Sequence, residues 1–169
     1  MRELKGYIEC GKITGKHGLL GEVRTEVWLD SIEDFRRLST VYLDESGNRA
    51  MQAERCRPAG NVVLLKLQGV DSPEAANALR GRTLYAKRED LSIPDGRVLI
   101  CDLYGLDVFD AKNDQRLGVL SDVIKNPAND IYVIKTDTGE EHMVPAVPAF
   151  LSRIDLDAGI WLNVIEGMF

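Results

Sequence analysis

Short runs of residues that favour β-strands recur along almost the whole chain, and this recurrence limits the fold more than any other feature. The runs are rich in β-branched and aromatic residues, and turn-forming clusters such as DESGN and NPAN separate them. The predicted strands cover 7–13, 22–29, 41–43, 49–56, 61–68, 83–87, 103–110, 116–125, 130–137, 141–147 and 159–165. Because strands about 8–12 residues apart are typical of barrels and sandwiches, we expect a mostly all-β protein.

Two segments depart from the strand pattern and predict helices. In 71–81, either Asp71 or Ser72 can cap the N-terminus, a proline follows in the first turn, and Gly81 can end the helix. A shorter helical turn is predicted at 31–38, where a serine and an aspartate are spaced as in a capping box. The fold class therefore includes a few short helices.

A polar segment at 88–98, which contains a proline and a glycine, is the best candidate for a linker. The division that we predict is a first domain at 1–92, a linker at 93–98 and a second domain at 99–169. Each part has enough strand-like runs for a small barrel, and two such units fit the spacing better than one long meander.

The charge balance changes near the same place. Residues 1–95 contain 15 Lys and Arg and 15 Asp and Glu, whereas residues 96–169 contain 6 and 12. An acidic second domain repels nucleic acid on average and suits a basic protein partner. The first domain is neutral overall and can still present a local basic patch.

In the segment TGKHGLLGEV at 14–23, three glycines surround a lysine and a histidine, a composition that phosphate-binding and catalytic loops can share. Its spacing is neither the G-x-G-x-x-G of a dinucleotide fold nor the G-x-x-x-x-G-K of a phosphate loop, and a strand rather than a helix follows. A general base would also need an orienting acid and a nucleophile nearby. We therefore predict a structural turn with a lysine and a histidine at its tip. The turn glycines are Gly15, Gly18 and Gly21, and the tip residues are Lys16 and His17.

Other classes of site have little support in the sequence. Cys10, Cys56 and Cys101 are scattered without a C-x-x-C pair, and the chain has only two histidines. We expect no metal, no cofactor and no catalytic residues. The first residues contain no apolar stretch of the signal-peptide type, and no apolar run has the roughly 18 residues of a membrane helix. The expected location is the cytoplasm, with no membrane partner.

Several stretches together resemble the RimM family of ribosome maturation factors, in the order and at the spacing of that family. The stretches that carry the resemblance are GKITGKHGLLGEVRTEVW at 11–28, LLKLQGVDSPEAANALRGRTLYAKREDL at 64–91, DLYGLDVFD at 102–110, LGVLSDVIKNPANDIYVIK at 117–135, VPAVPAFLSRIDLDAGIWL at 144–162 and EGMF at 166–169. The resemblance implies a six-stranded barrel of the reductase and translation-factor type, followed by a PRC-type β-barrel. It also implies a non-enzymatic chaperone of 30S assembly, which binds ribosomal protein nineteen of the small subunit and assists maturation of the head region of 16S rRNA.

One segment of three residues departs from the family pattern. The family usually has a Tyr-Tyr-Trp run where this chain has Val98, Leu99 and Ile100, and the resemblance gives those aromatics a part in ribosome binding. Aliphatic side chains can bury area but supply no hydroxyl groups. Three interpretations stay open: another anchor, an aliphatic version of the same surface, which we favour, or a first core strand of the second barrel.

The resemblance and the charge pattern together predict two contact regions on what we expect to be a monomer. Residues expected to contact the protein partner are Val98, Leu99, Ile100, Asp102, Leu103, Gly105, Asn126, Asn129 and Asp130. Residues expected to lie near RNA on the 30S precursor are Lys16, His17, Arg80, Arg82, Lys87 and Arg88. The alternative function is a flavin- or nucleotide-binding barrel protein, which the absence of a phosphate-loop spacing disfavours.

Overall fold

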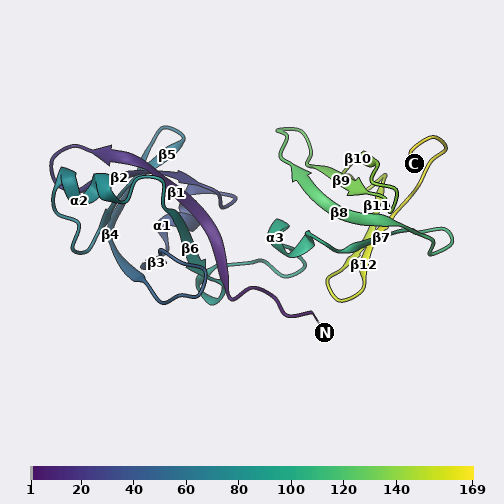
Figure 1. The fold of residues 1–169 in the computed structure, drawn as a ribbon, viewed down its shortest axis with the longest axis horizontal. Coiled ribbons are helices and arrows are strands. Elements are labelled where there is room, and N and C mark those ends of the chain that lie inside the picture. Colours follow the sequence, from purple (N-terminus) through teal and green to yellow (C-terminus); the bar gives the residue numbers. More distant parts are fainter. Residues whose placement is uncertain (1) are drawn as a thin grey trace. The chain divides into compact units, whose positions relative to one another are not determined.

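The computed structural model describes residues 2–169 and divides them into two compact units (Figure 1). One unit is Lys5–Asp95, and the other contains Gly96–Phe169 together with the residues before Lys5. The prediction of a mostly β protein with few short helices is confirmed, because each unit is built on one six-stranded sheet. Arg2 belongs to the second unit, where its backbone N–H donates to Asp157 and its guanidinium to the carbonyl of Tyr104.

The first unit is a closed barrel with the strand order β1-β2-β5-β4-β3-β6. Its strands are β1 (Tyr7–His17), β2 (Glu22–Val27), β3 (Thr40–Tyr42), β4 (Ala50–Ala59), β5 (Val62–Leu67) and β6 (Thr83–Lys87). All neighbouring pairs are antiparallel. Register shifts in β1 and β4 add local twist, which helps a sheet of this size to curve into a barrel.

The barrel interior is filled by alternating apolar residues from each strand. Fully buried members include Ile13, Val23, Val63, Leu65 and Leu84. Alternation places the intervening residues of most strands on the outer surface, whereas in β5 Val62 and Leu64 are buried as well. The barrel therefore has a dry core, and its candidate binding residues lie on the outside and at the strand ends.

Two short helices join the barrel strands. α1 (Ile32–Arg36) is capped by Ser31, and α2 (Pro73–Ala78) is capped by Ser72, whose hydroxyl accepts from the N–H of Ala75. The capping alternative is thus resolved in favour of Ser72, because Asp71 instead accepts from Lys66 at 2.9 Å. α2 is shorter than the predicted 71–81, and a one-turn 3₁₀ helix, η1 (Arg88–Asp90), follows β6.

Thr25 lies in the barrel core opposite Ile13 and Val63, fully buried. Its hydroxyl is, among residues 2–169, the one buried side-chain polar atom without a hydrogen-bond partner. Because an unpaired buried hydroxyl is destabilising, Thr25→Val should raise the free energy of unfolding by about 1 kcal/mol. Urea denaturation measures this. The control is Thr14→Val, which removes a hydroxyl that donates to the carbonyl of Arg24. A loss of stability in Thr25→Val would show that the hydroxyl is paired in solution.

The second unit is a six-stranded sheet with the order β10-β9-β8-β7-β12-β11. Its strands are β7 (Asp107–Asp110), β8 (Arg116–Ile124), β9 (Ile131–Lys135), β10 (Glu141–Pro145), β11 (Leu151–Asp155) and β12 (Gly159–Leu162). β7 and β12 are parallel, and the other pairs are antiparallel. Leu120, Ile134, Val144, Ile160 and Leu162 form the centre of its core.

Two sequence predictions in this unit need correction. Residues 100–103 form a short helix, α3 (Ile100–Leu103), so 98–101 is not a first core strand, and the strand predicted at 103–110 begins only at Asp107. The predicted strands also omit 151–155, which forms β11. The turn comes after Asp155, whose carboxylate accepts from the N–H groups of Asp157 and Ala158.

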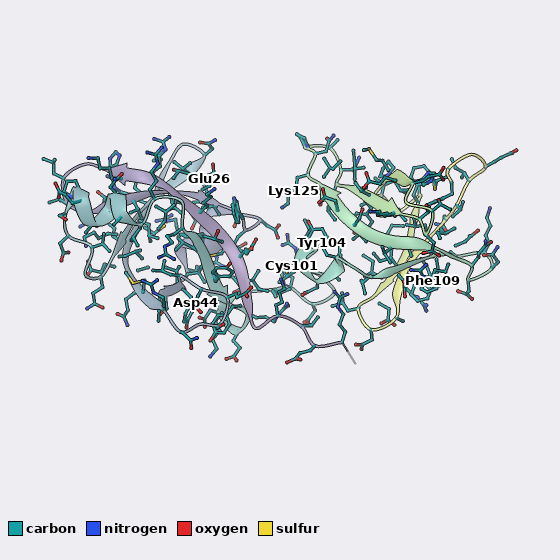
Figure 2. All side chains as sticks on the ribbon, viewed as in Figure 1. Glu26, Asp44, Cys101, Tyr104, Phe109 and Lys125 are labelled. Carbon is teal, nitrogen blue, oxygen red and sulfur yellow. The ribbon has the colours of Figure 1, made fainter. Side chains whose placement is uncertain are left out.

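A cation–aromatic ladder crosses the outer face of β11, β12 and β7. The guanidinium of Arg153 lies 3.7 Å from the ring centroid of Trp161, which stacks on Phe109 at 5.1 Å (Phe109 is labelled in Figure 2). The indole N–H of Trp161 donates to Asp114 at 2.7 Å. These contacts hold three strands together from the outside and complement the core.

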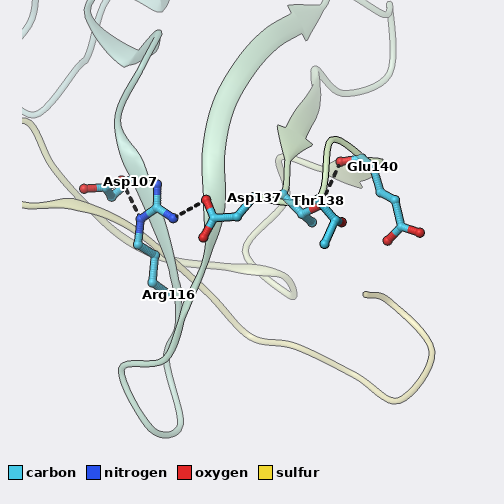
Figure 3. Close-up of polar contacts among 6 residues, drawn as sticks. Asp107, Arg116, Asp137, Thr138 and Glu140 are labelled. Carbon is cyan, nitrogen blue, oxygen red and sulfur yellow. Dashed lines mark hydrogen bonds and ion pairs between the residues drawn. The ribbon is translucent and has the colours of Figure 1, made fainter.

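Arg116 joins three segments of the second unit (Figure 3). It donates to Asp107 on β7 at 2.8 Å and to Asp137 in the turn after β9 at 2.7 Å. These pairs are exposed and each contributes little stability. They neutralise two carboxylates on this side of an acidic unit.

Candidate functional site

The segment at 14–23 forms the end of the β1–β2 hairpin. Lys16 and His17 are the last residues of β1, so they flank the turn rather than occupy its tip as predicted. Gly15 is also inside β1, next to a register shift, and its assignment as a turn glycine was wrong. The turn consists of Gly18, Leu19, Leu20 and Gly21, because His17 pairs with Glu22 across the hairpin.

The two turn glycines have left-handed backbone angles but different surroundings. Gly18 has φ of +64° and open space around the position of a Cβ, whereas Gly21 has φ of +89° and packs directly on the backbone of Val70. A side chain at Gly21 would collide with the Val70 carbonyl group. The turn is therefore fixed against the connection between β5 and α2.

The predicted RNA-proximal residues fall into two groups. Arg80 and Arg82 precede β6 on the half of the barrel nearer the hairpin turn, because the N–H of Ile13, four residues before the end of β1, donates to the carbonyl of Arg82 at 2.9 Å. Lys87 pairs with Tyr7 at the opposite end of β1. At about 3.3 Å per strand residue, the five steps from Arg82 to Lys87 span roughly 16 Å. Lys87 also forms an ion pair with Glu89, and Arg88 donates to the carbonyl of Lys5.

The hairpin end is electropositive because its acids are paired and its cations are not. Glu22 accepts two hydrogen bonds from Arg57, both at 3.1 Å, and these bonds hold the pKa of Glu22 below its usual value. Within residues 2–169, the side chains of Lys16, Arg24, Arg80 and Arg82 form no hydrogen bond or ion pair. Unpaired cations on one surface favour an anionic partner.

In the second unit, much of the predicted contact run at 98–103 points inward. Val98 and Ile100 are partly buried against the core, while Asp102 and Leu103 are only 4% and 3% exposed. Asp102 and Leu103 are buried because α3 turns that side of the segment toward the core, and their contact with a partner stays a prediction. Leu99 precedes the helix as its N-cap residue.

The helix ends beside the second predicted segment. Gly105 donates its N–H to the carbonyl of Leu120 at 2.9 Å, which places the end of α3 along β8. The 125–130 turn that follows β8 is exposed at Asn126 and Asn129. Asn126 accepts from the N–H of Ala128, and the carbonyl of Asp130 accepts from Ala146. The end of α3 thus lies along β8, the strand that leads into this turn.

Sequence reasoning missed the exposed apolar residues of this side. Inward residues of β8, β9 and β10 alternate with outward ones. On the outward face Ile124 pairs with Ile131, and the exposed Met143 pairs with Val133, which is itself only 5% exposed. Met143 is 63% exposed, and Ile124 and Tyr104 are each 39% exposed. We name Tyr104, Ile124, Ile131 and Met143 the apolar strip. Strand alternation was the available signal, but the pairing register was not visible in the sequence.

Tyr104 connects the apolar strip to the acidic surroundings. It follows α3 (Tyr104 is labelled in Figure 2) and interacts with Asp122, an exposed residue of β8. Partial burial raises the pKa of the Tyr104 phenol, and the charge of Asp122 adds to this effect. Asp122, Asp130 and Glu141 border the strip.

Other kinds of site have little support in residues 2–169. Across residues 2–169, no group of three or more His, Cys, Asp or Glu side chains could hold a metal ion. In the same residues, no helix has the length and apolar character needed to cross a membrane. Burial raises the pKa of the Cys10 thiol to about 12 and that of Cys56 to about 11, so neither is a ready nucleophile at neutral pH.

Comparison with known proteins gives one consistent family. The model of the RimM N-terminal domain matches residues 8–91, and the model of the RimM PRC barrel domain matches residues 100–164. The ribosome maturation factor RimM of Clostridioides difficile (strain 630) is 35% identical, covering 99% of this chain and 99% of that protein. RimM of Clostridium botulinum (strain Langeland) is also 35% identical, over 91% of each chain.

Among solved structures, a crystal structure from Pseudomonas aeruginosa, described as a 16S ribosomal RNA processing protein RimM, is 28% identical. The match covers 94% of this chain and 98% of that chain, with a TM-score of 0.47. Both domain models match in the expected order, and the relatives align over nearly their full length. The chain therefore belongs to the RimM family of ribosome maturation factors.

Proposed function

We propose that this protein is a non-enzymatic chaperone of 30S assembly that acts in the cytoplasm. In this proposal the second unit binds ribosomal protein nineteen of the small subunit, and the first unit contacts the head region of 16S rRNA in the precursor particle. Transient binding at both places would hold an assembly intermediate until the head folds. The observation that carries the proposal is the exposed apolar strip within an acidic unit.

The apolar strip has the composition of a protein-docking surface. Interfaces favour aromatic and methionine anchors at the centre with polar groups around them, and Tyr104 and Met143 are exposed anchors of this kind. Ribosomal proteins are mostly basic, so the acids beside the strip would speed and orient docking. The family pattern has its aromatics at the positions of the aliphatic run 98–100. Tyr104, four residues after that run, also supplies an aromatic hydroxyl.

Binding to purified ribosomal protein nineteen and to precursor particles tests the proposal. We expect the protein to sediment with the particle and to form a complex with the isolated ribosomal protein at low salt. If it bound neither, the proposal would be wrong. The flavin- or nucleotide-binding alternative makes a different prediction: the purified protein would show an absorbance spectrum with flavin or nucleotide bands.

The unpaired cations at the hairpin end give a separate prediction for RNA. Each phosphate contact releases counterions, so the logarithm of the affinity falls with the logarithm of the salt concentration. Lys16→Gln and Arg82→Gln should each reduce this slope by about 1 for binding to the precursor particle. Lys87→Gln is the matched control, since Lys87 is ion-paired at the opposite end of β1. An unchanged slope in both test variants would exclude the hairpin end from RNA contact.

A further inference from the structure

Two adjacent leucines form the tip of the β1–β2 hairpin. Leu19 is 82% exposed and Leu20 is 70% exposed, which makes them the two most exposed of the large apolar residues in the described chain. A single exposed leucine is common on protein surfaces. Two successive leucines at a turn that bury almost no area contribute little to the stability of this fold, so a structural role does not account for their presence.

The turn presents these leucines in a fixed way. The contact of Gly21 with the Val70 backbone anchors one side of the turn, and the pairing of His17 with Glu22 closes its base. A turn fixed in this manner loses less conformational entropy on binding than a flexible loop does. The leucines are therefore suited to insertion into a partner.

The charges around the tip indicate the kind of partner that the tip fits. Lys16 flanks the leucines on β1, and Arg24 lies across from Gly15 on β2. Arg82 approaches from β6 beside Ile13. The nearby acids are neutralised, Glu22 by Arg57 and Asp71 by Lys66. An apolar tip surrounded by unpaired cations matches an anionic surface that also offers apolar faces.

RNA has both properties, because its backbone is anionic and its bases present apolar faces wherever they are unstacked, as in loops, bulges and ends. Apolar side chains inserted against bases are a known device of proteins that bind nucleic-acid grooves. We infer that Leu19 and Leu20 form an apolar wedge that packs against bases of the rRNA, while Lys16, Arg24 and Arg82 contact the adjacent phosphates. This inference rests on the proposed function, since it specifies how the first unit engages rRNA.

The test compares the double variant Leu19→Ser, Leu20→Ser with the parent protein. The probes are a transcript of the 16S rRNA head region and the 30S precursor particle, over a range of salt concentrations. Loss of the wedge should weaken binding to the transcript by about 10- to 100-fold at every salt concentration. The slope of the logarithm of the affinity against the logarithm of the salt concentration should stay unchanged. Ile165→Ser, at a residue 56% exposed in the second unit, is the matched control and should bind normally.

The variant should fold normally because neither leucine is buried, and circular dichroism with a thermal midpoint checks this. The double variant Leu19→Ala, Leu20→Ala is a milder change, and it should lose less affinity for the transcript. Transcript binding equal to that of the parent would overturn the wedge, as would a loss confined to purified ribosomal proteins, which would indicate a protein contact. Particle binding by the parent without transcript binding would also overturn it, yet would leave the proposed function standing.

Discussion

Replacing Gly21 by alanine is expected to lower the free energy of unfolding of the first unit by about 3 kcal/mol, whereas Gly18→Ala should cost about 1 kcal/mol. Both residues have left-handed backbone angles, which disfavour alanine. Only at Gly21 would the added methyl group also collide with the backbone of Val70. The pair therefore separates the cost of the backbone angle from the cost of the close contact.

Urea denaturation followed by tryptophan fluorescence measures this difference. Trp28 follows β2 in the first unit, and Trp161 lies on β12 in the second. A Trp161→Phe background therefore makes the signal report the first unit alone. Equal losses for Gly21→Ala and Gly18→Ala would show that the hairpin turn is not fixed against Val70.

The second large effect concerns the apolar strip. Tyr104→Ala and Met143→Ala should each weaken binding to ribosomal protein nineteen by about 10-fold, and the double variant by about 100-fold, because exposed anchors become buried in an interface. Both side chains are substantially exposed in the free protein, so the folded state should tolerate the changes. Titration calorimetry with the isolated ribosomal protein measures the affinities.

Ile165→Ala is the control for this pair. Ile165 is 56% exposed in the same unit, but it follows β12, next to a carbonyl group that accepts a hydrogen bond from Lys112. Its replacement should leave the affinity unchanged. If Ile165→Ala weakened binding as much as Tyr104→Ala, the docking surface would lie elsewhere on the second unit.

Local sequence signals predicted most strands well because alternation and turn residues act over a few neighbours. They failed where tertiary contacts decide the structure. The apolar character of Ile100 and Leu103 suits a strand as well as a helix, and only packing against the second core favours α3. β11 (Leu151–Asp155) was missed because its last residues already belong to the acidic segment that forms the following turn.

The candidate sites show the same limit. Arg82 lies beside Ile13, on the half of β1 nearer the hairpin turn, whereas Lys87, only five residues later in the sequence, pairs with Tyr7 at the other end of β1. The apolar strip arises from the register between β8, β9 and β10, which places Ile124 beside Ile131. Such cross-strand proximity depends on long-range pairing that a single sequence does not reveal.

A structure of this protein bound to the 30S precursor, determined by electron cryo-microscopy, tests the central claim most directly. We predict that the apolar strip of the second unit contacts ribosomal protein nineteen. In the same complex, the β1–β2 hairpin tip should pack on 16S rRNA of the head region. A complex in which the strip faces solvent, or in which the second unit rests on RNA alone, would contradict the account.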